Sequence, residues 1–272
     1  MTNSIPIPTV YGPVRSWRVG MSLGVDLICE TSVCSFNCIY CQLGAIQKIT
    51  NQRKLFIPTT TVMEDFQSSR WQESDIITYS GSGEPTLATN LGEVAREISR
   101  KTSIPQLVLT NGTILTDRAV IQDLQNIQRT YIKLDAATED GFQRVNRPVE
   151  GITLHFIIEN ILQFKQEYHG FLGIQIMFLP SNFLQLENYV LILNQIRPDE
   201  VQLNTPTRPY PKYWHISSRG GHSRELRRYE SVPLRTISLE DAEKAEDFLR
   251  RETGLNIVSV YQHADSKTLT ER

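Results

Sequence analysis

The densest reactive chemistry in the sequence is a run of three cysteines within eight residues. Cys34, Cys38 and Cys41 form a C-x3-C-x2-C motif, and Tyr40 stands directly before the last cysteine. Thiolates are ligands that zinc ions and iron–sulfur clusters share. The motif therefore indicates a metal centre and leaves its identity open.

A zinc site and an open iron–sulfur cluster differ in whether the protein provides a fourth ligand. Structural zinc needs four ligands, and cubane iron–sulfur clusters usually take four cysteines. The one remaining cysteine, Cys29, lies five residues before the motif, and the first histidine is His155. The alternatives are a three-ligand cubane with one open iron, a zinc site closed by Cys29, and unliganded cysteines. The compact motif favours the open cluster, and a buried structural role is favoured for Cys29.

Alternating apolar runs and helical patterns indicate the elements that must position the cysteines. This alternation predicts an α/β fold with parallel strands, a partial (β/α)6 TIM-type barrel with a C-terminal extension. We expect one domain over residues 1–272, with an N-terminal arm at 1–20, the barrel core at 21–206 and the extension at 207–272. The expected strands are 22–28, 76–79, 107–110, 131–134, 174–179, 200–203 and, in the extension, 256–261. The expected helices are 62–70, 91–101, 116–127, 153–168, 182–196 and 238–251.

Polar and glycine-rich residues follow the expected strands. The cysteine motif follows the first, Gly83 and Glu84 follow the second, Asn111 follows the third, and Asp135 ends the fourth. Ligands of parallel α/β proteins bind at the carboxyl ends of the strands. We therefore expect these side chains to face the cysteines. The alternatives are a solvated carboxylate at Glu84, a turn residue at Asn111 and a strand-end or capping role for Asp135.

The cysteine motif with Tyr40 resembles the signature of the radical S-adenosylmethionine (SAM) superfamily. Gly81–Pro85 resembles the Gly-Gly-Glu motif of that superfamily, with Ser82 in place of the first glycine. Leu109–Gly112 resembles its ribose-side loop. Lys133–Ala136 and Asn146–Pro148 resemble a later strand and the loop after it. Two other stretches, Tyr11–Gly20 and Gln202–Pro209, are similar to the iron–sulfur oxidoreductases related to wybutosine-synthesis tRNA enzymes. The resemblance covers about residues 10–210.

This resemblance implies an enzyme, a radical SAM oxidoreductase or transferase. Its cofactors would be a 4Fe–4S cluster and SAM, and its electron donor a small protein such as flavodoxin or ferredoxin. Reductive cleavage of SAM would give a 5′-deoxyadenosyl radical that abstracts hydrogen from a substrate. The implied cluster ligands are Cys34, Cys38 and Cys41, and the implied SAM-binding residues are Tyr40, Gly83, Glu84, Asn111 and Asp135.

Each implied SAM residue has a chemical reason. Gly83 lets the backbone approach closely, and the Glu84 carboxylate can accept from the SAM ammonium group. Asn111 and Asp135 offer partners for ribose hydroxyls, and Tyr40 can pack against adenine or simply join the core. Three cations are candidates for anionic groups on SAM or the substrate, with surface charges as the alternative: Lys133, Arg144 and Arg147.

The C-terminal segment Thr207–Arg235 mixes arginines with aromatic residues, which can cover phosphates or stack bases. An irregular solvated segment over the barrel mouth is the alternative. An RNA nucleoside, as in tRNA, is a substrate that suits both this segment and the family neighbours. The competing hypotheses are a glycyl-radical-type activase acting on a partner protein, and a non-catalytic Cys-ligated metal protein that binds nucleic acid.

Composition adds limits. Hydrophobic residues make up 40% and charged residues 21% of the 272 residues, which is ordinary for a globular protein. The net charge of −2 gives no global signal for nucleic-acid binding. The N-terminus lacks the pattern of a signal peptide, and no apolar run approaches the roughly 20 residues that span a bilayer. We expect a cytoplasmic protein with no membrane association.

Overall fold

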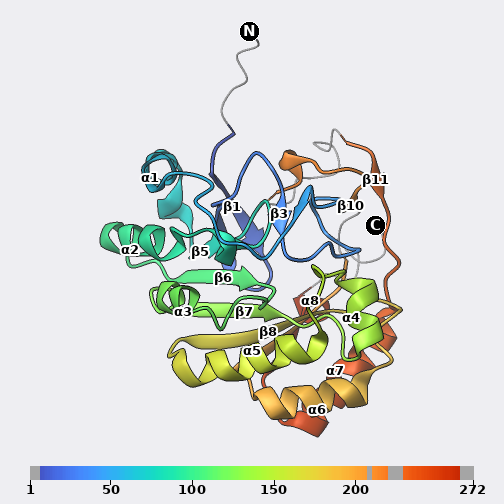
Figure 1. The fold of residues 1–272 in the computed structure, drawn as a ribbon. Helices are drawn as coiled ribbons and strands as arrows, with labels where there is room; N and C mark the ends of the chain where they lie inside the picture. Colours follow the sequence, from blue (N-terminus) through green and yellow to red (C-terminus); the bar gives the residue numbers. More distant parts are fainter. Residues whose placement is uncertain (1–6, 207–209, 220–228, 264–272) are drawn as a thin grey trace.

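The structure, a computed structural model, describes residues 7–206, 210–219 and 229–263. In this part of the chain the main sheet has eight strands, which curl into an open half-barrel (Figure 1). Neighbouring strands from the second to the last are parallel, and the first is antiparallel to the second. In spatial order the strands are β1 (Val10–Ser16), β2 (Gly20–Val25), β5 (Ile76–Tyr79), β6 (Gln106–Thr110), β7 (Arg129–Lys133), β8 (Phe171–Met177), β9 (Glu200–Asn204) and β12 (Ile257–Ser259).

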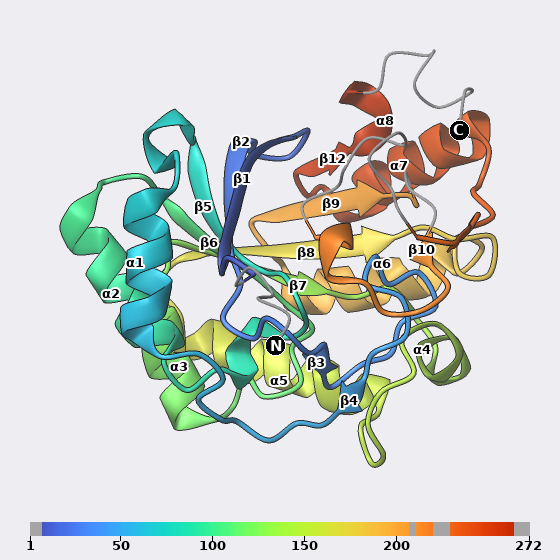
Figure 2. The same ribbon diagram turned by 90° about the horizontal axis from the view of Figure 1, so that it is seen from above.

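Helices between successive strands cover the outer face of the curled sheet (Figure 2). The six parallel strands from β2 to β9 confirm the expected partial (β/α)6 barrel. Within the described residues, no helix is both long and apolar enough to cross a bilayer. The helices are α1 (Thr59–Ser68), α2 (Leu91–Lys101), α3 (Arg118–Leu124), α4 (Glu139–Val145), α5 (Leu154–Glu167), α6 (Leu186–Ile196), α7 (Leu239–Thr253) and α8 (Val260–His263).

The hydrophobic pattern explains why these elements form a layered core. The apolar residues of α2 recur at helical spacing, so they share one face, and Leu91, Val94 and Ile98 are fully buried. All residues of β5 are buried, as expected for a parallel strand with both faces covered. Burial of these apolar side chains is the main favourable contribution to folding.

Two helices begin later than the sequence predicts, and side-chain hydrogen bonds explain both. The helix expected from residue 116 begins after Asp117, which caps α3 by accepting from the Ala119 N–H at 2.8 Å. Asn182, where the expected helix 182–196 starts, lies before α6, because its Nδ2 donates to the carbonyls of Asp135 at 2.6 Å and Met177 at 2.7 Å. Asn182 thus joins the ends of β7 and β8 instead of starting a helix.

The terminal segments differ in detail from the expectation. Part of the predicted N-terminal arm forms β1, which pairs with β2 from Val10 opposite Val25 to Ser16 opposite Gly20. The expected strand 256–261 is only β12, and the chain continues directly into α8. The extension also contains β10 (Tyr210–Pro211), η3 (Ile216–Ser218) and β11 (Ser231–Val232), and β10 pairs with β11.

A buried ion pair fastens the extension to the barrel. The Arg219 guanidinium donates to the Asp26 carboxylate at 2.7 Å, and the two residues are only 8% and 1% exposed. Arg219 also donates to the Pro8 carbonyl at 3.0 Å. Asp26 lies just after β2 and accepts the backbone N–H groups of Ile28 and Cys29, each at 3.0 Å. One carboxylate therefore joins both terminal segments to the start of the cysteine loop.

Replacing Asp26 should destabilise the protein strongly. Asp26→Ala leaves the buried Arg219 charge without its partner, so we expect a loss of about 3–5 kcal/mol in the free energy of unfolding. Denaturant titration followed by circular dichroism measures it. The control is Glu240→Ala, which removes an exposed ion pair with Lys244 and should change stability by less than about 1 kcal/mol. Equal small effects for both variants would show that the buried pair does not hold the fold.

Candidate active site

The loop that carries the cysteines is held by backbone pairing on two sides. Cys34 ends the short strand β3 (Val33–Cys34), which pairs with β4 (Lys48–Ile49). Further along, the Asn37 N–H donates to the Asn146 carbonyl at 3.0 Å, and the Ile39 N–H donates to the Val145 carbonyl at 2.9 Å. The protein's own backbone contacts therefore fix the loop against the end of α4.

The thiols of this loop are half-buried and receive N–H donors. Cys34 Sγ accepts from the Phe36 N–H at 3.4 Å and from Asn111 Nδ2 at 3.5 Å. Cys38 Sγ accepts from Asn146 Nδ2 at 3.5 Å. Hydrogen bonds to sulfur stabilise thiolate character and tune the potential of iron–sulfur clusters. The surroundings of two of the three sulfurs thus suit metal-bound thiolates.

Removal from water raises the pKa of all three thiols. Burial is the largest cause for each of them, and it raises the pKa of Cys38 to about 12 with a further contribution from the Asp135 carboxylate. The pKa of Cys34 lies well above its usual value for the same reason, with Glu84 as the second cause. Without a cation the thiols therefore keep their protons, and metal binding must release them.

The three thiols lie on one loop, but they do not converge on a single metal position. Among the described residues, no three Cys, His, Asp or Glu side chains lie close enough together to hold a single metal ion. Cys29 belongs to a different environment, because its Sγ lies 3.6 Å from the Ile7 carbonyl and 3.8 Å from the Arg219 guanidinium. Cys29 is buried, as expected for a structural cysteine.

Gly83 is required by a backbone contact with the cysteine loop. The Val33 N–H donates to the Ser82 carbonyl at 2.9 Å, and the Glu84 N–H donates to the Val33 carbonyl at 3.0 Å. A β-carbon at residue 83 would lie 1.7 Å from that Val33 oxygen, and its φ of +156° adds to the demand for glycine. The close backbone approach expected at Gly83 is therefore made by the neighbouring cysteine loop.

Glu84 is a buried carboxylate, not a solvated one. Its Oε1 accepts from the Thr86 N–H at 3.2 Å and from the hydroxyls of Thr86 and Thr110, each at 2.7 Å. Its Oε2 accepts the Asn111 N–H at 2.8 Å. Burial is the main cause of a raised pKa for this carboxyl, and these donors oppose the shift. Glu84 thus ties the loop after β5 to the loop after β6, while Oε2 keeps room for one more donor.

Asn111 connects the β6 loop to the cysteine loop. Its Nδ2 donates to Ser35 Oγ at 2.8 Å as well as to Cys34 Sγ. Its Oδ1 accepts the Thr113 N–H at 3.1 Å, which is the Asx-turn role considered as an alternative. The side chain expected beside a ribose therefore orients the first cysteine.

Asp135 binds several polar groups on the Cys38 side of the site. Its Oδ1 accepts the Met177 N–H at 2.8 Å and lies 3.2 Å from Lys133 Nζ. Its Oδ2 accepts the Tyr40 hydroxyl and, at 3.1 Å, Asn146 Nδ2. Tyr40 therefore points its hydroxyl at this carboxylate, with the Lys133 ammonium 5.2 Å from its ring centre. Asp135 is 1% exposed, so this is a buried polar network.

Asn146 was not singled out as a site residue, although it lies in the quoted Asn146–Pro148 stretch. Its Nδ2 donates to both Cys38 and Asp135, while its buried Oδ1 has no hydrogen-bond partner among the described residues. An unpaired buried acceptor is costly, and a ligand donor would satisfy it. The backbone pairing of residues 36–39 with residues 145–148 is what brings Asn146 beside Cys38, and local sequence patterns do not show that pairing.

The basic residues that were candidates for binding anionic groups have different surroundings in the structure. Lys133 pairs with Asp135, Arg144 lies on α4, and Arg147 lies beside Cys38. In the C-terminal segment, Lys212 and Tyr213 are exposed, whereas Arg219 is buried. Four of the arginines that define the expected RNA-binding segment lie outside the described residues: Arg208, Arg224, Arg227 and Arg228.

The residues present fit the cofactors that the resemblance implies. The donor set consists of three cysteine sulfurs, two of which receive N–H donors. In a cubane each cysteine binds a different iron atom, so the ligands need not converge as they do on zinc. The unpaired Asn146 Oδ1 and the spare capacity of Glu84 Oε2 are acceptors for a ligand with amino or hydroxyl groups.

Replacing Gly83 should displace the cysteine loop. In Gly83→Ala the new methyl group overlaps the Val33 oxygen, so we expect a loss of about 3 kcal/mol or more in the free energy of unfolding. Denaturant titration measures this loss, and the rate of thiol labelling in the metal-free protein should rise.

Gly151→Ala is the matched control for this variant. Gly151 has a φ of +86° with nothing within 4 Å of an added β-carbon, so its cost is the backbone strain alone, about 1–2 kcal/mol. If the two variants lose the same stability, the contact between Val33 and Gly83 does not constrain the loop.

Comparisons with known proteins agree with this geometry. The family described as the radical SAM superfamily matches residues 30–190. UPF0026 protein slr1464 of Synechocystis is 43% identical over 248 residues, which are 91% of this chain and 93% of that protein.

Two solved structures share the fold at low identity. Archaeal TYW1 is 15% identical with a TM-score of 0.53, over 87% of this chain and 75% of that one. Streptococcus suis SuiB bound to its precursor peptide SuiA is 13% identical with a TM-score of 0.60, over 86% of this chain. The match spans only about half of SuiB, 48% of its chain.

The family match begins just before the cysteine loop and ends within α6, so it includes the three loop cysteines and the polar residues around them: Glu84, Asn111, Asp135 and Asn146. The protein belongs to the radical SAM superfamily and is a SAM-dependent enzyme.

Proposed function

We propose that Cys34, Cys38 and Cys41 ligate a 4Fe–4S cluster whose fourth iron is open to SAM. The support is the set of three thiols on one loop, with N–H donors aimed at two of their sulfurs. Cys29 is turned toward Ile7 and Arg219, which argues against the zinc site that it would close. The chemistry these cofactors supply is reductive cleavage of SAM to methionine and a 5′-deoxyadenosyl radical that abstracts hydrogen from a substrate.

The protein's part in this reaction is to bind and orient SAM. We assign the SAM ammonium to Oε2 of Glu84, because Oε1 already accepts three hydrogen bonds and Oε2 accepts one. Gly83 holds that carboxylate against the cysteine loop. Asn111 and Asp135 line the ribose side in this proposal, and Asn146 Oδ1 adds an acceptor there.

Tyr40 has a positioning role in the same proposal. Its hydroxyl is held by Asp135, so the orientation of its ring is fixed before SAM arrives. A ring fixed in this way offers an apolar surface to adenine at small entropic cost. The Asp135 carboxylate thus orients both Tyr40 and Asn146.

An RNA nucleoside is the substrate that we propose. The fold is shared with archaeal TYW1, and the extension exposes an aromatic and cationic pair, with Lys212 Nζ 5.7 Å from the ring centre of Tyr213. Stacking on aromatic rings and phosphate contacts are the usual means of binding single-stranded RNA. A polypeptide substrate, as for an activase, is the second candidate, and the fold shared with peptide-bound SuiB favours it.

The remaining assignments follow from the same proposal. The electron donor is a small reductase protein of the flavodoxin or ferredoxin type, and the clustered thiols suit the reducing cytoplasm. The whole chain acts as one radical SAM domain, since Arg219 of the extension pairs with Asp26 at the barrel mouth.

SAM cleavage is the direct test of the proposed function. After anaerobic reconstitution with iron and sulfide, we expect dithionite and SAM to give 5′-deoxyadenosine, measured by chromatography. Replacement of any loop cysteine by alanine should reduce its formation at least about 100-fold, because each thiolate holds one iron of the cluster.

Cys29→Ala is the control for the loop cysteines, because its thiol contacts Ile7 and Arg219 instead of the loop. It should keep the iron content and the cleavage activity. An active Cys38→Ala enzyme, or a wild-type protein that binds four irons and leaves SAM intact, would refute the proposed function.

The RNA assignment predicts that the purified protein carries nuclease-sensitive nucleic acid. Binding of a single-stranded oligonucleotide should weaken as salt rises, and the double variant Lys212→Ala, Tyr213→Ala should lose about tenfold in affinity. Fluorescence anisotropy measures both effects. Arg144→Ala, on α4, is the control. Binding that is independent of salt and unchanged in the double variant would favour the polypeptide substrate instead.

A further inference from the structure

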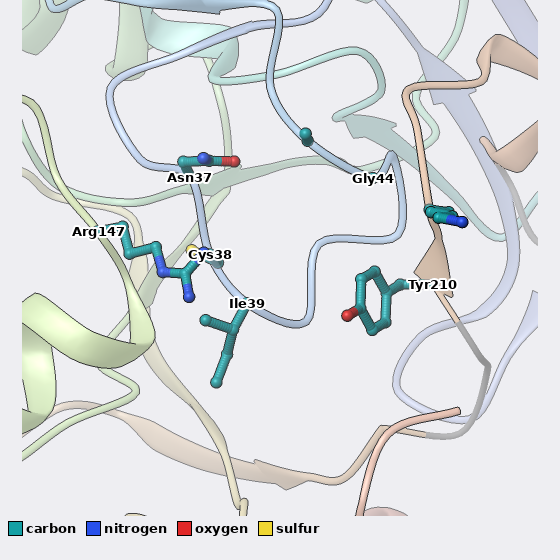
Figure 3. Close-up of a pocket in the computed structure, with 8 residues that line it drawn as sticks. Asn37, Cys38, Ile39, Gly44, Arg147 and Tyr210 are labelled. Carbon is teal, nitrogen blue, oxygen red and sulfur yellow. The ribbon is translucent and has the colours of Figure 1, made fainter. Parts of the chain in front are cut away.

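A cavity of about 230 Å³ adjoins Cys38 on the outer part of the cysteine loop. Three separate segments line it, namely the cysteine loop, the turn after α4 and the extension at β10 (Figure 3). In Figure 3, Arg147 lies beside Cys38 and Tyr210 faces them from the other wall. The cavity touches a predicted cluster ligand, yet neither Arg147 nor Tyr210 has a role in the proposed SAM site.

The wall contributed by the extension is seated against the cysteine loop. A β-carbon at Gly44 would lie 2.6 Å from the Tyr213 carbonyl oxygen and 2.9 Å from that of Pro211. The His215 N–H also donates to the Leu43 carbonyl at 3.2 Å. Gly44 lets the two backbones approach this closely, so the cavity is a built feature of the fold.

The polar groups at the cavity are rich in donors. The Arg147 guanidinium makes no hydrogen bond or ion pair with any other described residue, and Asn37 Nδ2 finds no acceptor among them. Lys212 lies on the wall formed by the extension, where its partner is Glu230 at 3.3 Å. Both members of that ion pair are exposed, so the pair is weak and an anion can compete for the lysine.

The backbone at Arg147 is strained. Its φ of +46° lies in the left-handed region, and the following residue is Pro148, which further restricts the residue before it. The Asn37 N–H holds this conformation by donating to the carbonyls of Asn146 at 3.0 Å and Arg147 at 3.1 Å. Strained residues that their surroundings hold in place cluster at ligand sites. The strain here sets the guanidinium beside the cysteine loop.

We propose that this cavity, termed the Arg147 pocket, binds a phosphate group of the substrate. Arginine binds phosphate through its planar fork and lysine as a point charge, and two cations suit a phosphate better than a carboxylate of lower charge. The volume is below the roughly 300 Å³ of pockets that hold a whole small ligand. The pocket therefore takes one group of a larger substrate. This inference rests on the proposed function, because it names the substrate's chemical class.

Protection of Arg147 from chemical modification tests the pocket directly. The reconstituted protein is treated with phenylglyoxal at fixed ionic strength, and labelling of Arg147 and Arg144 is measured by peptide mass spectrometry. We expect inorganic phosphate to slow labelling of Arg147 at least about fivefold and to leave Arg144 unchanged, since Arg144 does not line the cavity. Acetate and chloride should protect far less.

A variant that should still fold gives an independent test of the pocket. Glycine suits the φ of residue 147, so Arg147→Gly should fold and yet lose the phosphate-dependent rise in melting temperature that the wild type and Arg144→Ala show. Equal protection by chloride, or no protection by phosphate, overturns the proposal. Protection of Arg147 by SAM alone assigns the residue to the cofactor, and protection only by flavodoxin assigns it to the electron donor; either result also overturns it.

The two proposals fail separately. Phosphate protection needs no radical chemistry, so a protein that does not cleave SAM can still retain an intact Arg147 pocket. A protein that forms 5′-deoxyadenosine but shows no phosphate protection keeps the proposed function and loses the pocket.

Discussion

The carbonyl oxygen of Val33 occupies the place where residue 83 would carry a β-carbon, and the arrangement of the site depends on that contact. It joins the strand that ends in Cys34 to the loop that follows β5. The backbone then turns directly into Glu84, whose carboxylate reaches the loop after β6. One glycine therefore fixes the distance between the first cysteine and the carboxylate assigned to SAM, and any larger side chain must move one of the two loops.

From this contact a polar network spreads along the carboxyl ends of the strands. Glu84 and Asn111 form one half around Cys34, and Asp135 and Asn146 form the other half around Cys38. Nearly all of its donors and acceptors are paired within the protein, so the geometry exists before a ligand arrives, as efficient binding requires. The unpaired Asn146 Oδ1 and the spare capacity of Glu84 Oε2 are the exceptions. They are the groups through which a ligand can complete the network.

The local pattern of the sequence predicted the barrel, because period and turn chemistry are local properties. The order of cysteines, Glu84, Asn111 and Asp135 predicted which residues share one end, since parallel strands align their carboxyl ends. Contacts across long sequence separations were beyond such reasoning. The pairing of Asp26 with Arg219 joins residues 193 positions apart, and Asn182 was expected to start a helix rather than bind Asp135. Asn111 was expected to face a ligand, and its internal bond to Cys34 emerged only in three dimensions.

The central claim is that three thiolates leave one iron of the cluster open to SAM. Electron paramagnetic resonance of the dithionite-reduced, reconstituted protein tests it most directly, with spectra recorded before and after SAM is added. The account predicts a reduced 4Fe–4S signal whose g values change when SAM binds the open iron. A cluster signal that SAM leaves unchanged, or a reconstituted protein that holds zinc and shows no signal, would contradict it.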